Sequence, residues 1–264
     1  MALTLYYHPF SSYSWKALIP LYEAGTPFTP PRIDDPQIAT EWKRRWPIAR
    51  FPVLVEEASG LTLPEASIII EYLDSHYPGP QPMLPSDPDL RLEVRLLDRF
   101  FDNYLHASVQ KIVGDRLRDA ERRDAPGVEE ARAMLDTSYA WLDARMADRQ
   151  WAVGDCFTVA HCAAAPALFY ADWVHPIGNA FPGIAAYRAR LLARPSVKRA
   201  VDDARPFRAL FPGGAPDRDR GDLPYPFAEH GCQMRKVKCR TQRSLSPAEL
   251  IKPMSTMIAP RSKR

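Results

Sequence analysis

The sequence predicts two domains of different class, an α/β domain followed by an all-α domain. Within about the first 80 residues, the apolar patterns run strand, helix, strand, loop or helix, strand, strand, helix. That order is typical of an α/β unit with a mixed sheet. Five prolines between Pro78 and Pro88 then mark a linker. From Leu90 to about Phe211 the apolar residues recur at helical spacing, which predicts an all-α second domain.

The first strand and the first helix organise the α/β domain. Apolar residues have strand density from Leu3 to Tyr7, the chain breaks at His8-Pro9, and helical spacing resumes from Trp15 to Tyr22. The segment Ser11 to Ser14 lies at the junction and supplies three serines and a tyrosine. Their hydroxyls should lie beside unpaired N–H groups at the positive end of the helix dipole. The stretch therefore predicts an anion site, without naming the anion.

The remaining elements are shorter or less regular. The first helix should end near Gly25, and the prolines at 30 and 31 limit the next strand to an edge position. The other elements expected in the first domain are a strand at 28–33, a weak helix at 35–46, a hairpin of 51–56 with 61–63, and a helix from 64–67 that stops before Pro78. The helices expected in the second domain are 92–112, 128–146, 159–173, 184–192 and 196–204. We divide the chain into residues 1–78, a linker at 79–89, a helical domain at 90–213 and a tail at 214–264.

Composition limits the function classes. The chain has 264 residues, 46% of them hydrophobic, and no apolar run approaches the length of a membrane span. Strand-like sequence begins at Leu3 without a basic leader, so we expect a cytoplasmic protein that does not bind membranes. The four cysteines lie in the second half without CxxC spacing, which indicates neither a disulfide scaffold nor a zinc finger. We expect no metal site.

The net charge of +3 is unevenly distributed. The tail from Gly214 to Arg264 holds 11 Lys and Arg against 5 Asp and Glu, whereas the other 213 residues hold 24 against 27. The body therefore has no electrostatic signature of nucleic-acid binding. For the tail we favour a disordered basic extension, ordered at most as a turn near 246–251. A partner-binding arm and a sequence outside the ancestral reading frame are the alternatives.

Five motifs resemble those of the soluble glutathione transferases, over residues 3 to about 213. SSYSWKALIPL is similar to the serine-containing first helix turn of the theta-like and zeta-like classes, and RFPVLVEE to the family's strand with a leading cis proline. LPEASIIIEYLDSHYP is similar to the acidic-plus-serine motif that opens the third helix. VGDCFTVAHCAAAPAL and ARPSVKRAVDDARP resemble the capping segment and the late helices of the second domain. The resemblance implies a thioredoxin-like first domain and a homodimer.

The resemblance also implies an activity, the addition of the glutathione thiolate to small hydrophobic electrophiles. A free thiol is mostly protonated at neutral pH, so the site must favour the anion. We place Ser11 in the position of the hydroxyl that donates to the sulfur. An alignment on Pro9 with beta-like members, whose catalytic residue is a cysteine, makes Ser12 the alternative. Tyr6 and Tyr7 compete for this role, but their place inside a strand favours packing.

Glutathione is the expected co-substrate, and each of its ends needs a partner. The residue before a cis proline can pair with the cysteinyl backbone, which assigns Phe51 and Pro52 to that role. Glu65, with the N–H groups of Ala66 and Ser67, fits the γ-glutamyl ammonium and carboxylate. The family's usual serine is here Ala66, so weaker glutathione binding is expected unless Ser67 substitutes. For the glycyl carboxylate the candidates are Lys43, Arg44 and Arg50.

The electrophile pocket is expected to involve Tyr13, Phe101 and Tyr104, with His106 as a further guess. A second departure from the family is His161, where an aspartate normally closes a capping box onto Thr158. We expect the histidine to leave that helix start weaker. A role of His161 as a metal ligand with Cys156 or Cys162 is disfavoured.

Two rival functions remain open. One is a non-catalytic ligand-binding or interaction protein on the same fold, which Ala66 and His161 make plausible. The other is a thiol-disulfide or dehalogenating enzyme, whose redox version is disfavoured because the first domain has no cysteine.

Overall fold

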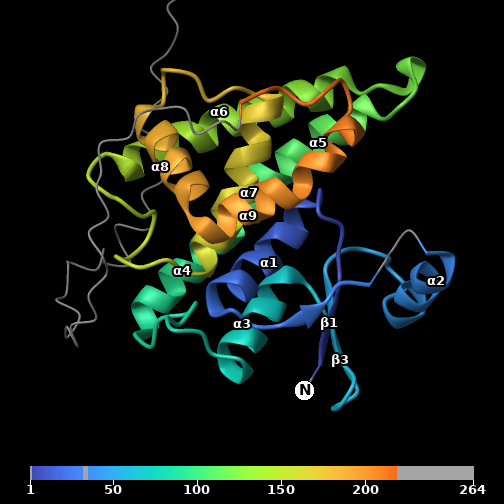
Figure 1. The fold of residues 1–264 in the computed structure, drawn as a ribbon. Coiled ribbons are helices and arrows are strands. Elements are labelled where there is room, and N and C mark those ends of the chain that lie inside the picture. The colour runs from blue at the N-terminus through green and yellow to red at the C-terminus, as the bar shows by residue number, and fades with distance from the viewer. Residues whose placement is uncertain (1, 32–34, 219–264) are drawn as a thin grey trace, which may run out of the picture. The chain divides into compact units, whose positions relative to one another are not determined.

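The computed structural model describes residues 2–31 and 35–218 (Figure 1). The chain divides into two compact units, Met1–Pro224 and Tyr225–Arg264, and everything described below belongs to the first. Most of the predicted tail, from residue 219 onward, lies outside the described residues, so the expected disorder there stays a prediction.

A four-stranded sheet forms the core of the first domain. The strands are β1 (Leu3–Tyr6), β2 (Phe28–Thr29), β3 (Val53–Glu56) and β4 (Leu61–Pro64), in the order β2-β1-β3-β4. β1 pairs in parallel with β2 and antiparallel with β3, and β4 is antiparallel to β3. The sheet is therefore mixed, as the sequence predicts.

Helices cover both faces of this sheet. α1 (Ser12–Ala24) and α3 (Ala66–His76) pack on the face that carries Leu3, Leu5 and Leu54. α2 (Pro36–Arg45) covers the opposite face, where it meets Tyr6, Val53 and Val55. The alternation of side chains along each strand supplies these two apolar faces.

The second domain is entirely helical in the described residues. Its elements are α4 (Pro88–Phe100), a π-helical segment η1 (Phe101–His106), α5 (Ala107–Arg116), η2 (Ala120–Arg122), α6 (Ala125–Met146), α7 (Val159–Val174), α8 (Pro182–Ala193), α9 (Pro195–Ala204) and η3 (Arg205–Leu210). The predicted fold class is thus confirmed. The expected single helix over 92–112 is wrong in one respect, because the π turn interrupts it.

α7 is the central helix of the second domain and joins it to the first (Figure 1). Nearly all of its residues are buried, and small alanines let neighbouring helices approach closely. α1 packs directly against it: the Trp15 ring lies 4.8 Å from that of Phe169 and 5.4 Å from that of Tyr170. The start of α1 is therefore held at the boundary of the two domains.

His161 corrects the expectation of a weak start for α7. Its Nδ1 accepts the backbone N–H of Thr158 at 2.9 Å, so the capping box is closed. Burial, and to a smaller extent the Arg194 charge, lowers the pKa of His161 to about 3, so the imidazole stays neutral and Nδ1 keeps its lone pair. A neutral histidine therefore does the work of the aspartate acceptor.

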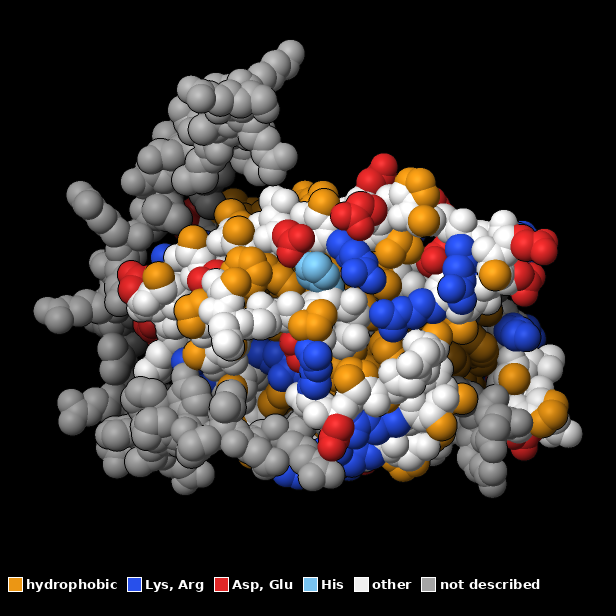
Figure 2. All heavy atoms as spheres, turned by 90° about the horizontal axis from the view of Figure 1, so that it is seen from above, with side chains coloured by type: hydrophobic (Ala, Val, Ile, Leu, Met, Phe, Trp, Pro, Cys, Tyr) orange, Lys and Arg blue, Asp and Glu red, His pale blue; other side chains and the backbone are white. Residues whose placement is uncertain are grey.

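Figure 2 views the molecule of Figure 1 from above, and this face carries charged and hydrophobic side chains together. Figure 2 shows Lys and Arg side chains interspersed with Asp and Glu, and hydrophobic side chains between them. Neither sign of charge covers this face alone.

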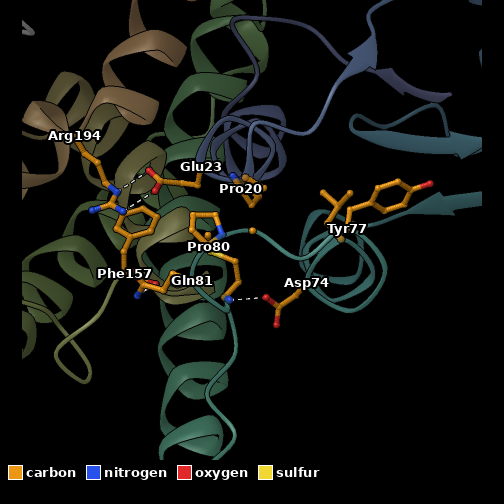
Figure 3. Close-up of a pocket in the computed structure, with 12 residues that line it drawn as sticks. Pro20, Glu23, Asp74, Tyr77, Pro80, Gln81, Phe157 and Arg194 are labelled. Carbon is orange, nitrogen blue, oxygen red and sulfur yellow. Dashed lines mark hydrogen bonds and ion pairs between the residues drawn. The ribbon is translucent and has the colours of Figure 1, made fainter. Parts of the chain in front are cut away.

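A second connection between the domains lies on the linker side (Figure 3). The Arg194 guanidinium donates two hydrogen bonds to Glu23, at 2.7 and 2.6 Å, and its Cζ lies 4.0 Å from the centre of the Phe157 ring. Asp74 accepts the N–H groups of Met83 and Leu84 at 2.6 and 3.2 Å. These contacts tie α1 and the linker to the helical domain, opposite the site described next.

Candidate functional site

A cleft of about 730 Å³ opens between the two domains at the start of α1. One wall comes from the first domain and the other from η1, α5 and the end of the helical domain. The described residues that line it are Phe10, Ser11, Ser12, Tyr13, Trp46, Ala49, Arg50, Phe51, Pro52, Glu65, Ala66, Arg99, Asp102, Asn103, His106, Val109, Gln110, Val113, Leu117, Tyr170, Leu210, Phe211 and Pro212. Nine residues named as candidates from the sequence thus share one cleft: Ser11, Ser12, Tyr13, Arg50, Phe51, Pro52, Glu65, Ala66 and His106.

Ser11 is the N-cap of α1. Its Oγ accepts the backbone N–H of Ser14 at 3.3 Å, so the hydroxyl proton is not used in the cap. The first turn of α1 contains no acidic residue. Among the described residues no group accepts the Ser11 hydroxyl proton, so this proton and the helix dipole both favour an anion at this point of the cleft.

Ser12 lies one residue further into the helix and is buried. Its Oγ is 2.6 Å from Nε2 of His106, which η1 brings across from the helical domain. The amide nitrogen of Gln110 also approaches this Nε2, at 3.0 Å. Because an amide nitrogen only donates, Nε2 acts as the acceptor and the Ser12 proton points toward it.

His106 remains neutral in this environment. Burial, with a smaller effect from the Lys16 charge, lowers the pKa of His106 to about 3. A base this weak removes a proton from the Ser12 hydroxyl poorly. The pair therefore orients the start of α1 against η1. The Tyr13 ring packs edge-on against the same imidazole, with centroids 4.5 Å apart.

The Phe51-Pro52 peptide bond is cis, as the sequence predicts. The Phe51 ring stacks on Trp42 of α2, with centroids 4.1 Å apart and planes 7° from parallel. α2 thereby supports the loop before β3 from behind. Arg50 lines the cleft beside this loop, whereas Arg44 forms two 2.8 Å hydrogen bonds with Glu41 on α2.

The start of α3 forms the opposite end of this wall. Glu65 has a φ of 73°, a conformation that a residue with a Cβ adopts only when its surroundings impose it. In the described part of the chain no side chain caps α3, so the first N–H groups of this helix have no side-chain acceptor there. The Glu65 carboxylate is exposed and lies at the cleft.

A buried ionic cluster lies behind this helix start. Lys16 of α1 is 1% exposed, and its Nζ lies 2.6 Å from Asp98 and 2.7 Å from Asp102. The Ser67 hydroxyl accepts from Lys16 and donates to Asp98, both at 2.9 Å, and it also accepts from Arg99. We call Lys16, Asp98, Asp102, Arg99 and Ser67 the ionic cluster. Burial raises the pKa of Asp102, and the Lys16 charge opposes this effect.

The cluster changes what Ser67 can do. A hydroxyl has one proton and two lone pairs, and here all three are used within the cluster. Ser67 is also not among the described residues that line the cleft. Its side chain therefore does not replace the hydroxyl that Ala66 lacks, and only its backbone N–H stays available at the start of α3.

The far half of the cleft is apolar. Its walls are Phe10, Val109 and Val113 of α5, Leu117 directly after that helix, and a segment from Leu210 to Pro212. Arg116 holds this segment by donating to the Pro212 carbonyl at 3.4 Å. An uncharged hydrophobic molecule fits such a surface.

Two residues predicted for this pocket are placed elsewhere. Phe101 is fully buried in the core of the helical domain, and the Tyr104 side chain is exposed. Neither is among the described residues that line the cleft. In this segment Asp102, Asn103 and His106 line the cleft, in line with Arg99 before them and Gln110 after them at ordinary helical spacing, so Phe101 and Tyr104 fall on other faces of the helix. His106 matches the earlier guess.

Four residues of the ionic cluster were missed in the sequence: Lys16, Asp98, Asp102 and Arg99. The signal for Lys16 is its position inside the apolar face of α1, where a charge needs partners. Nothing in the sequence shows that Asp102 and Arg99 are those partners or lie next to them.

Among the described residues, no group of three or more His, Cys, Asp or Glu side chains is placed to hold a metal ion. Within the same part of the chain, every helix is too short or too polar to cross a membrane.

Two family models match the sequence. Residues 1–75 match the glutathione S-transferase N-terminal domain, and residues 125–190 match the glutathione S-transferase C-terminal domain. A glutathione S-transferase of Methylobacterium radiotolerans, crystallised with glutathione sulfonate, is 32% identical with a TM-score of 0.66. The alignment covers 76% of this chain and 95% of that one.

Two curated relatives carry other names. A stringent starvation protein A homolog of Coxiella burnetii is 29% identical over 205 residues, which is 76% of this chain and 92% of that protein. FtsZ-localized protein A of Caulobacter vibrioides is 26% identical over 234 residues, 84% of this chain and 98% of the relative.

Proposed function

The chain belongs to the glutathione S-transferase family, and from this premise we propose that it is an enzyme that adds the thiolate of glutathione to small hydrophobic electrophiles. One observation carries the proposal. The free hydroxyl proton of Ser11, the loop at Phe51-Pro52 and the acid Glu65 line the same cleft, next to an apolar pocket. The cleft thus offers a place for the sulfur, for each end of the peptide and for the second substrate.

The site lowers the pKa of the thiol by favouring its anion. A shift of one to two pKa units needs about 1.4 to 2.8 kcal/mol. One hydrogen bond to a charged acceptor supplies about 1.5 to 3 kcal/mol, and the helix dipole adds about 0.3 to 1 kcal/mol. Ser11 and the start of α1 are therefore sufficient without a metal or a cationic side chain. A serine in this position supports the theta-like and zeta-like classes as the proposed subfamily.

Glutathione is proposed to lie along the loop before β3. The backbone N–H and C=O of Phe51 pair with the cysteinyl residue, in the manner of an added strand. Arg50 is proposed as the cation for the glycyl carboxylate, because Arg44 is paired with Glu41 and Lys43 is not among the described residues that line the cleft. Glu65 receives the γ-glutamyl ammonium, and the N–H groups of Ala66 and Ser67 face its carboxylate.

The electrophile is proposed to occupy the apolar half of the cleft. Tyr13 lines the cleft next to Ser12 and packs against His106. Burial, with a smaller effect from the Asp102 charge, raises the pKa of Tyr13 to about 12, so its phenol is protonated at neutral pH. Together with Phe10, Val109 and Phe211 it forms a surface for small hydrophobic molecules, as expected for a cytoplasmic detoxification enzyme.

Binding of glutathione to the unmodified protein tests this proposal. We expect saturable heat of binding in a calorimetric titration, and conjugation to an aryl chloride activated by nitro groups. Because position 66 is an alanine without a hydroxyl, the affinity for glutathione should be lower than in relatives that have a serine at this position. Absence of saturable binding would contradict the proposal.

A non-catalytic role on the same fold is the second candidate. It is favoured by Ala66, by the committed Ser67 hydroxyl and by relatives whose names describe starvation response and FtsZ localisation. A protein that binds no glutathione but forms a stable complex with another protein would support it.

We also propose a homodimer, formed through α4 and α6. Leu92 and Leu96 on α4 and Met134 and Trp141 on α6 are all exposed. The ring centres of Phe100 on α4 and Trp141 on α6 lie 4.5 Å apart, so the apolar residues of the two helices form one continuous surface. So large an apolar face on one subunit indicates a protein partner, and a second copy is the expected one in this family.

Trp141→Glu should convert the dimer to a monomer, because it places a charge in the middle of the apolar face. The measurement is the mass in sedimentation equilibrium. Ile48→Glu is the control, since Ile48 is 63% exposed but lies in the loop before β3. A mass of one subunit for the unmodified protein would contradict the dimer.

A further inference from the structure

The ionic cluster raises a question about the glutamyl end of the site. Ala66 has no hydroxyl, and the Ser67 hydroxyl is fully used within the cluster. Backbone N–H groups alone therefore face the α-carboxylate of a bound γ-glutamyl group. A carboxylate held by so few donors binds weakly, unless another side chain completes its hydrogen bonds.

Arg99 is the cationic side chain at this place. It lies on α4, lines the cleft beside Glu65 and Ala66, and its side chain is 51% exposed. Its Nε and Nη2 donate to Asp98 and Nη2 also to Asp102. In the described part of the chain, no hydrogen bond is formed by its other terminal nitrogen, Nη1. Hydrogen bonds thus hold the Nε and Nη2 edge of the Arg99 guanidinium, and Nη1 stays available to a ligand.

The charged side chains at this end of the cleft also match the zwitterionic head of a γ-glutamyl group. Lys16 and Arg99 balance Asp98 and Asp102, so the cluster itself is neutral. The head of a γ-glutamyl group carries one ammonium and one carboxylate. Glu65 complements the first, and the open edge of Arg99 with the start of α3 complements the second.

We propose that Arg99 is the side chain that selects for the α-carboxylate of the γ-glutamyl group, in place of the hydroxyl that Ala66 lacks. This inference rests on the proposed function. The fixed side of the guanidinium limits the freedom lost on binding, which favours a directed contact over a loose surface charge.

The test compares two ligands that lack a thiol, so that binding does not depend on thiolate formation. One is S-methylglutathione, and the other is its analogue without the α-carboxylate. Arg99→Ala should weaken binding of S-methylglutathione about 10- to 100-fold, as expected for one lost hydrogen bond to a charged group. Its affinity for the analogue should stay within about twofold of the unmodified protein, because the contact is absent there.

Arg95→Ala is the matched control. Arg95 lies one turn earlier on α4, its side chain is 50% exposed, and it pairs with Glu71 at 2.6 Å, but it is not among the cleft residues. It should change neither affinity. Arg99→Lys should recover part of the loss, and adding Ala66→Ser to Arg99→Ala should recover part by restoring a hydroxyl.

The outcomes separate this inference from the proposed function. If Arg99→Ala weakens both ligands equally, or neither, Arg99 does not read the carboxylate and the inference is overturned, while glutathione binding stands. If the unmodified protein does not bind S-methylglutathione, the proposed function and the inference are both overturned.

Discussion

Lys16→Met is expected to lower the free energy of unfolding by about 3 to 5 kcal/mol. Lys16 is 1% exposed and forms ion pairs of 2.6 and 2.7 Å with Asp98 and Asp102. Methionine fills a similar volume but leaves two carboxylates without their buried cation. The cost is that of the uncompensated charges, and it should be measured by denaturant unfolding at constant pH.

Lys198→Met is the matched control for this variant. Lys198 pairs with Asp202 at 2.6 Å, the same separation, but its side chain is 66% exposed. An exposed pair contributes at most about 1 kcal/mol. Asp98→Asn and Asp102→Asn, added to Lys16→Met, should recover much of the stability. Equal losses for Lys16→Met and Lys198→Met would show that burial of the cluster has no energetic consequence.

The elements that sequence predicts well are those with local signals. α1 ends at Ala24 because Gly25 takes a φ of 64°, which glycine adopts without strain. β3 begins after Pro52, and its alternating side chains reach both layers of helices. In such segments, capping, proline and periodicity all favour one structure, so the order of the elements follows from the sequence.

The sequence predicts the site residues whose role follows from one segment, such as a helix start, and misses those whose role depends on contact between two distant segments. Ser11 and Glu65 each lie at a helix start, which the sequence shows. Ser12 and His106 are 94 residues apart, and no local pattern shows that the π turn carrying His106 lies against the start of α1. The partners of Lys16 come from α4 and η1, so no local pattern shows which acids neutralise it.

His161 illustrates a different limit of sequence reasoning. A histidine at the third position of a helix predicts a poor acceptor when it is taken as exposed and partly charged. The rings of Trp151 and Phe157, centred 4.9 and 5.5 Å from the imidazole, create the environment that keeps it neutral. The chemistry of the side chain is thus decided by residues that surround it in three dimensions.

Removal of the Ser11 hydroxyl is expected to lower the conjugation rate by about 10- to 1000-fold, judged from the loss of single donors in other enzymes. Glutathione affinity should change little, because the hydroxyl acts on the thiolate and not on the ends of the peptide. Ser11→Ala also removes the N-cap of α1, which costs about 0.5 to 2 kcal/mol of stability. Ser11→Gly removes the same hydroxyl with a capping loss of only a few tenths of a kcal/mol, so both variants should be assayed.

Ser12→Ala decides between the two serines. The Ser12 proton points to Nε2 of His106, 2.6 Å away, whereas the Ser11 proton is free. Ser12→Ala should therefore destabilise the protein by about 0.5 to 1.5 kcal/mol, the net value of one hydrogen bond, since the Gln110 amide still donates to the imidazole nitrogen. Its conjugation rate, measured where the variant is fully folded, should fall much less than that of Ser11→Gly. If instead the rate is lost in Ser12→Ala and kept in Ser11→Gly, Ser12 is the donor, with His106 turned to donate to its oxygen and free its proton for the sulfur.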